Sequence, residues 1–178
     1  MNSILPPAPT HTFSLVTSDR PGVLVRIALV FARRGYNIES LAVSRGGAEG
    51  FARMTILSRG DPENSEQIVK QLAKLVDVVF VTNHRGETPV EVEVALIKLH
   101  CDGALRKQAL ALAEKRGARS ADETGGRLIL SYAAAPDAIS AFIDELQPCR
   151  VEELVRSGKI VMDAGASHFA HLLGAHVG

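Results

Sequence analysis

The sequence has few cysteines, no surplus of charge of either sign and no long apolar run. Its two cysteines, Cys101 and Cys149, are too few for a disulfide scaffold and lack the spacing of metal ligands. Basic and acidic residues number 20 each, which argues against nucleic-acid binding, because that function normally needs a basic surplus or stripe. No apolar run approaches the roughly 20 residues of a membrane span, and the first residues lack the features of a signal peptide. We therefore expect a cytoplasmic protein with reduced cysteines and with neither a nucleic-acid nor a membrane partner.

The sequence also lacks the common catalytic and cofactor-binding motifs. It contains no P-loop, no HExxH and no GxSxG segment. Gly46, Gly47 and Gly50 fall between two predicted strands, so they indicate a hairpin turn rather than a dinucleotide site. Three histidines near the C-terminus have no acidic partners beside them, which favours solvated side chains over a metal cluster. They are His168, His171 and His176. We expect a non-catalytic chain that holds neither a metal nor a cofactor.

What is present is the pattern of two small α+β units. A chain of 178 residues with 46% hydrophobic residues is ordinary globular material, long enough for two domains of about 70–80 residues. Residues 1–10, with three prolines, are expected to form a flexible lead-in. The first unit, 11–84, is predicted to begin with a strand at 11–19 and a helix at 21–34. Two strands at 37–45 and 51–58 follow, then a helix from Asp61-Pro62 onward and a last strand at 76–81. This is the βαββαβ order of a ferredoxin-like unit.

The same order is predicted again after a linker at 85–89. The second ferredoxin-like unit, 90–160, has a helix with Leu105, Ala109 and Leu112 expected to point inward, and a tail follows at 161–178. In such a unit the first and last strands are antiparallel neighbours. Cys101 ends the former and Cys149 begins the latter, so we expect the two thiols to lie near each other.

The corner between the first strand and the first helix is a candidate ligand site. Pro21 suits the first position of a helix, where its missing N–H is not needed. The N–H groups of Gly22, Val23 and Leu24 then point outward at a helix N-terminus, which is a ready site for a carboxylate. An amino acid also needs an acceptor for its ammonium group, and Asp19 is suitable in type.

Asn37 is a second candidate acceptor, at the start of the strand 37–45. In the strand order 4-1-3-2 this strand lies at the sheet edge, away from the first strand. Asn37 can therefore meet such a corner only if two chains pair through their edges. The sequence alone leaves open whether Asn37 completes a partner's site or is a turn residue with a capping role. We also expect a homodimer, because the apolar stretches Leu41–Val43 and Met54–Ile56 would be poor solvent surfaces.

Several segments resemble a known family. "DRPGVL", "FARRGYNIESLAV" and "RMTI" are similar to the ACT domain of the small, regulatory subunit of acetolactate synthase (acetohydroxyacid synthase). "KQLAKLVDVVFV", "EVEVALIKL" and "VRSGKI" follow in the same order, so the resemblance spans roughly residues 11–163.

The resemblance implies a regulatory protein of branched-chain amino-acid (valine, leucine, isoleucine) biosynthesis. Such proteins bind valine or a related amino acid between two ACT domains, for feedback control. They also activate a separate catalytic subunit, which holds thiamine diphosphate, magnesium and FAD. The implied effector-binding residues are Asp19, Gly22, Val23 and Leu24 of one subunit, and Asn37 and Ile38 of its partner. Asp19 stands where the family commonly has asparagine. The alternatives are a stand-alone ACT-domain sensor of another amino acid and, as a different class, an enzyme.

Overall fold

The computed structural model describes residues 9–46, 48–85 and 89–164, which form two compact units. The described residues up to Val90, together with 161–164, make the first unit, and Glu91–Ile160 make the second. Among the described residues, no helix is long and apolar enough to cross a membrane. Part of the expected lead-in (1–8), part of the linker (86–88), Gly47 and the three C-terminal histidines lie outside the described residues.

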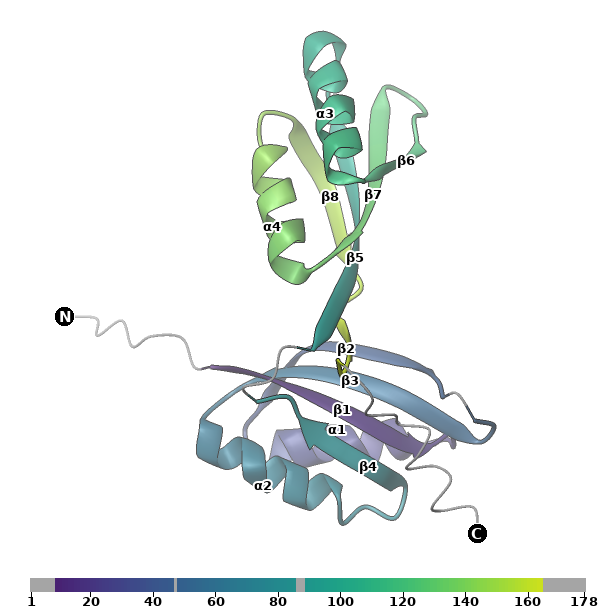
Figure 1. Ribbon diagram of the computed structural model, residues 1–178, viewed down its shortest axis with the longest axis vertical. Coiled ribbons are helices and arrows are strands. Elements are labelled where there is room, and N and C mark those ends of the chain that lie inside the picture. Colours follow the sequence, from purple (N-terminus) through teal and green to yellow (C-terminus); the bar gives the residue numbers. More distant parts are fainter. Residues whose placement is uncertain (1–8, 47, 86–88, 165–178) are drawn as a thin grey trace, which may run out of the picture. The chain divides into compact units, whose positions relative to one another are not determined.

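The first unit is one antiparallel sheet with both helices on the same face (Figure 1). Its strand order β2-β3-β1-β4 confirms the ferredoxin-like order predicted from the sequence. In chain order the elements are β1 (Thr10–Ser18), α1 (Val23–Arg33), β2 (Asn37–Arg45), β3 (Phe51–Arg59), α2 (Pro62–Leu72) and β4 (Val78–Asn83).

The core of this unit lies between the sheet and its two helices. Phe13 of β1 packs edge-to-face on Phe31 of α1, with ring centroids 5.4 Å apart. Met54 and Ile56 of β3 are buried in the same cluster. The expectation that Met54–Ile56 form an exposed apolar surface is therefore wrong, because β3 is a central strand whose apolar side chains face the helices.

Two element boundaries differ from the sequence prediction for local reasons. Helix α1 begins at Val23 rather than at Pro21, because Gly22 takes a left-handed conformation (φ 85°) that cannot continue a helix. Its end agrees with the prediction: Gly35, at φ 70°, reverses the chain after the helix. Strand β4 begins at Val78, and Val76 is 96% exposed in the turn that precedes it.

The second unit repeats the architecture, with α3 and α4 on one face of its sheet (Figure 1). The strand order is β6-β7-β5-β8, and a short strand β9 that the sequence analysis did not predict also pairs with β5. The elements are β5 (Val90–His100), α3 (Gly103–Arg116), β6 (Arg119–Asp122), β7 (Arg127–Ala134), α4 (Pro136–Glu145), β8 (Arg150–Arg156) and β9 (Ile160–Met162).

Helix α3 meets its sheet through small residues. Ala109 and Ala113 are its buried positions, one turn apart, and their short side chains let the helix approach the strands closely. The prediction for Ala109 is confirmed, and Leu112 packs against the core as a partly buried residue. The prediction for Leu105 is wrong: this side chain is 40% exposed, in the first turn of the helix.

Candidate functional site

The corner between β1 and α1 is held in place by backbone hydrogen bonds. After Ser18 the chain leaves the sheet, and the Asp19 N–H donates to the Gly50 carbonyl at 2.8 Å. Gly22 is the N-cap residue of α1, with φ 85° and ψ −10°. Residues with a Cβ rarely adopt this conformation, so glycine is what allows the chain to turn from the strand into the helix.

The N-terminus of α1 is neither capped by a side chain nor followed by an acidic residue in its first turn. Val23 points into the core, whereas Leu24 is 40% exposed beside the corner. Because the N–H groups of a first helical turn lack intrahelical partners and lie at the positive end of the helix dipole, this corner suits an anionic group such as a carboxylate.

An ion pair that the sequence analysis did not single out stands beside the corner. Nε and Nη2 of Arg26 lie 2.8 and 2.7 Å from Oδ2 of Asp77. The backbone carbonyl of Asp77 also accepts a hydrogen bond from the Ser18 N–H at 2.8 Å. Asp77 thus ties the end of β1 to the first turns of α1. In the sequence these residues look like ordinary surface charges, and only the position of Arg26 four residues after Gly22 hints at a role.

The Arg26 guanidinium also approaches the turn itself. A Cβ built on Gly22 would lie 3.3 Å from Nη1 of Arg26. The corner therefore combines a helix N-terminus, an acidic side chain at Asp19 and a partly exposed cation at Arg26, in keeping with a ligand that carries both charges.

Asn37 and Ile38 do not join this corner within one chain. Asn37 lies opposite Arg59 at one end of β3, whereas Ser18, just before the corner, lies opposite Phe51 at the other end. With nine residues in β3 and a rise of about 3.3 Å per residue, the two ends are about 26 Å apart. The Asn37 side chain is exposed, and the backbone carbonyl of Asn37 accepts a hydrogen bond from Oγ of Ser58 at 2.8 Å. The structure thus separates the two halves of the predicted site along a single sheet.

A second constellation joins Ser14, His84 and Asp163. Nε2 of His84 lies 2.8 Å from Oγ of Ser14, and Nδ1 lies 3.1 Å from Oδ1 of Asp163. The residue types match a serine-hydrolase triad, but Ser14 has no exposed surface and the His84 side chain is only 1% exposed. A nucleophile must reach its substrate, so these three residues form a structural tie rather than a catalytic group.

This tie and one further hydrogen bond hold residues 161–163 against the first unit's sheet. Nη2 of Arg53, on β3, donates to the Val161 carbonyl at 2.8 Å. Burial lowers the pKa of Arg53, and the nearby Asp163 carboxylate partly offsets this effect. Neither contact could be foreseen from sequence, because the partners are about 80 and 110 residues apart in the chain.

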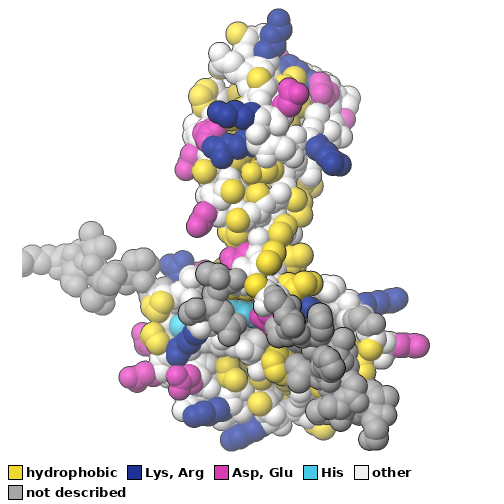
Figure 2. All heavy atoms as spheres, in the orientation of Figure 1, with side chains coloured by type: hydrophobic (Ala, Val, Ile, Leu, Met, Phe, Trp, Pro, Cys, Tyr) yellow, Lys and Arg dark blue, Asp and Glu magenta, His cyan; other side chains and the backbone are white. Residues whose placement is uncertain are grey.

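Neither the distribution of charge on the drawn face nor the grouping of metal-ligating side chains in the described residues indicates another kind of site. Basic and acidic side chains are interspersed over both units on the face drawn in Figure 2. Within the described ranges no group of three or more His, Cys, Asp or Glu side chains could hold a metal ion. The β1–α1 corner is therefore the strongest candidate for a binding site.

Comparison with known proteins agrees with the fold and with the motifs around the corner. A family model described as the AHAS small subunit-like ACT domain matches residues 13–80, and one described as the small subunit of acetolactate synthase matches residues 92–165. The probable acetolactate synthase small subunit of Archaeoglobus fulgidus is 37% identical over 155 residues, covering 87% of this chain and 97% of the relative. The acetolactate synthase small subunit of Mycolicibacterium smegmatis is 34% identical over 157 residues, covering 88% of this chain and 92% of the relative.

A solved structure extends the similarity to the fold of both units. The crystal structure of the acetolactate synthase small subunit from Thermotoga maritima matches with a TM-score of 0.78 and 34% sequence identity, covering 89% of this chain and 99% of that one. Sequence, family models and fold agree across both units, and the chain belongs to the family of acetolactate synthase small, regulatory subunits, with an ACT domain in its first unit.

Proposed function

We propose that this chain binds valine or a related branched-chain amino acid at the β1–α1 corner and thereby controls a separate catalytic subunit of acetolactate synthase. The observation that carries the proposal is the uncapped N-terminus of α1 at Gly22, within a domain of the ACT family. The chain would act in branched-chain amino-acid biosynthesis, activating its partner and relaying feedback inhibition. By resemblance, thiamine diphosphate, magnesium and FAD belong to that catalytic partner.

The ligand's two charged groups have complementary partners at the corner. Its carboxylate accepts hydrogen bonds from N–H groups in the first turn of α1, with Arg26 close by. Its ammonium group is balanced by the carboxylate of Asp19. The half-exposed side chain of Leu24 offers apolar contact for a branched side chain. Asn37 and Ile38 complete the site only from a second copy of the chain.

A homodimer through the β2 edges supplies that second copy. Strand β2 lies at the edge of its sheet, and Arg45, at its far end, is opposite Ala52, as is Thr17 of β1. Antiparallel pairing of two β2 strands about a twofold axis through Leu41 sets the partner's Asn37 opposite Arg45. That is the end of the sheet where the Asp19–Gly22 corner stands. Each of the two sites then takes its corner from one chain and its amide from the other.

Exposed apolar side chains lie near this edge of the sheet and would become buried in such a dimer. Val25 and Leu29 of α1 are 62% and 45% exposed, and Val43 of β2 is 49% exposed. Helix α1 contacts β2, so these side chains belong to neighbouring elements of one margin of the unit. Covering them would add apolar burial to the backbone hydrogen bonds of the paired strands.

Isothermal titration of the chain with valine, leucine and isoleucine, alone and with the catalytic subunit, tests the proposal. We expect saturable binding of at least one of the three and a change in stimulation of the catalytic subunit. Asn37→Ala should weaken binding about tenfold or more, because it removes a hydrogen bond to a charged group. Stimulation without effector should persist.

Asn64→Ala is the matched control, because Asn64 is an exposed asparagine on α2. It should bind like the parent chain. Equal affinity in the Asn37 and Asn64 variants would contradict a role for Asn37, and the absence of binding by all three amino acids would contradict the proposal itself.

A further inference from the structure

The two cysteines of the second unit occupy directly opposite positions at one end of its sheet. Strands β5 and β8 are antiparallel, with Leu99 opposite Val151 and His100 opposite Arg150. One step further along the same register sets Cys101 opposite Cys149. Both are free thiols and both are buried. The proximity predicted from the sequence is therefore confirmed.

This arrangement meets the geometric requirement for a disulfide. Directly opposite residues of antiparallel strands have Cα atoms about 4.5–5.5 Å apart, and disulfides span about 4.4–6.8 Å between Cα atoms. The bond can therefore form without a large backbone movement. It would join the end of β5, just before α3, to the start of β8, just after α4.

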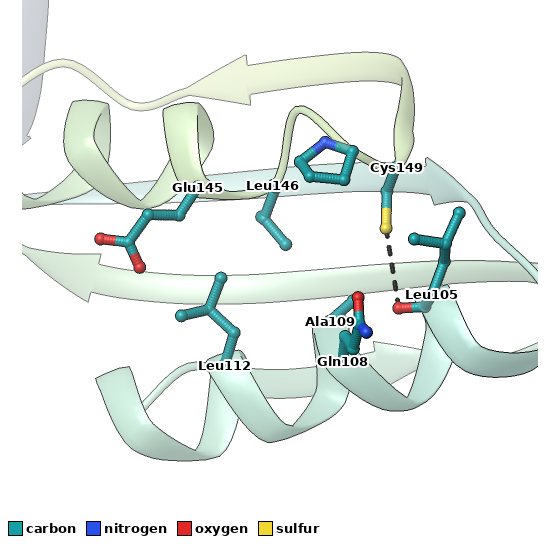
Figure 3. A pocket seen from close by; sticks show the side chains of 8 residues that line it. Leu105, Gln108, Ala109, Leu112, Glu145, Leu146 and Cys149 are labelled. Carbon is teal, nitrogen blue, oxygen red and sulfur yellow. Dashed lines mark hydrogen bonds between the residues drawn. The ribbon is translucent and has the colours of Figure 1, made fainter.

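A groove between α3 and α4 leads from the surface to one of the two thiols (Figure 3). Leu105, Leu112 and Leu146 line it, with Glu145 at the far end from Cys149. The Cys149 thiol lies 3.8 Å from the Leu105 carbonyl, at the edge of this groove. Cys101 is not part of the groove lining, so a small oxidant that enters the groove meets Cys149 first.

We propose that Cys101 and Cys149 form a latent internal disulfide site, which a peroxide closes through Cys149. In the first step the Cys149 sulfur attacks hydrogen peroxide, the O–O bond breaks, and the products are Cys149 sulfenic acid and one water. In the second step the Cys101 sulfur attacks the sulfenic sulfur, the S–O bond breaks, and a second water leaves with the Cys101 proton. The chain loses two hydrogen atoms, and the peroxide is reduced to two waters.

Protonation keeps the site reduced by default. Burial, and then the adjacent Cys101 thiol, raise the pKa of Cys149 from its ordinary value of 9.0 to about 11. The charged groups around it are Glu145, which lines the groove at its far end and pairs with Arg116, and Arg150, which follows Cys149 in the chain and lies opposite His100. Because only the thiolate reacts, the oxidation rate should rise about tenfold for each pH unit between 7 and 10.

The test is exposure of the full folded chain to hydrogen peroxide, followed by digestion without reduction and mass spectrometry. We expect a peptide pair joined through Cys101 and Cys149, within one chain, at a rate that rises with pH as stated. The oxidised chain should unfold at a Tm higher by roughly 5–15 °C for the second unit, because the bond closes a loop of about 50 residues. Adding a reductant should restore the original Tm.

Single-cysteine variants test the order of the steps. In Cys101→Ser, the Cys149 sulfenic acid cannot be resolved, so dimedone should label Cys149. In Cys149→Ser, Cys101 should react at least tenfold more slowly. Sulfinic acid or chain-to-chain disulfides in place of the internal bond would overturn the proposal. So would an internal disulfide that forms only in urea, and none of these three results depends on the variants folding.

Discussion

Gly22 joins two properties in one residue: a left-handed backbone and the absence of a side chain where the Arg26 guanidinium approaches the helix N-terminus. Gly22→Asp should impair both. The new side chain strains the φ of 85°, and its carboxylate lies where the ligand's own carboxylate would bind, within reach of Arg26. We expect at least a tenfold loss of affinity for branched-chain amino acids, measured by titration.

Gly22→Ala separates strain from charge in that experiment. It adds a Cβ at the same φ without a carboxylate, so it should bind more tightly than Gly22→Asp and more weakly than the parent chain. Should Gly22→Asp bind valine as the parent does, the pocket lies elsewhere, and Asn37 returns to being a turn residue.

Gly60 is required for a different reason, which is the space taken by a tyrosine ring. A Cβ at Gly60 would lie 2.2 Å from Cε1 of Tyr36, a buried ring whose hydroxyl donates to the Asp61 carbonyl. Gly60→Ala should therefore lower the free energy of unfolding by about 1–3 kcal/mol, measured by urea denaturation. In the double variant with Tyr36→Ala the two losses should be clearly less than additive, because the clash is gone. Simple additivity would show that the ring moves aside freely.

At the scale of elements, local sequence patterns predicted the bounds of a helix or strand correctly where those bounds depend on a few neighbouring residues. The range 37–45 for β2 is the observed one, and the stop of α1 at Gly35 follows from glycine's access to positive φ. The start of α1 was misplaced because proline at a first helical position and proline before a left-handed glycine look alike in sequence. Only the observed conformation of Gly22 separates them.

The features that could not be predicted from the sequence depend on which elements pack against each other in the folded chain. Leu105 fits a helical stripe, but the close approach of α3 uses Ala109 and Ala113 instead. The Arg26–Asp77 pair at the corner joins helix α1 to the turn before β4, 51 positions apart in the chain. For the site, the corner and Asn37 could be named from the sequence, whereas their position at opposite ends of β3, about 26 Å apart, required the strand register.

The segment after β9 gives a prediction at this scale. Asp163 faces the buried ring of His84, so Asp163→Ala removes the group beside Nδ1 of a side chain that is 1% exposed. The first unit should lose about 1–3 kcal/mol of stability, measured by urea denaturation. Asp144→Ala is the control, at an exposed position on α4. Equal stability in the two variants would show that the Ser14–His84–Asp163 tie contributes nothing measurable.

At the scale of the whole molecule, the proposed site requires two chains. We expect sedimentation at micromolar concentration to show a dimer of the 19.0 kDa chain. Val43→Lys should shift the equilibrium toward monomer, because it adds a charge at the paired edge. Effector binding should weaken in parallel, since each site would lose the partner's Asn37. A parent chain that is wholly monomeric under these conditions would contradict the proposed assembly.

The distance between the corner and Asn37 implies that two defective variants of the chain can complement each other in a mixed dimer. If the two halves of each site come from different chains, defects in different halves complement one another. A mixed dimer of one Gly22→Asp chain and one Asn37→Ala chain gathers both defects into one site and leaves the other site with an unaltered corner and an unaltered asparagine. A random mixture of two chains that scarcely respond to effector should then regain about a quarter of the parental sites, since half of the dimers are mixed. Titration of the co-refolded mixture measures this recovery, and a site contained in one chain would show none.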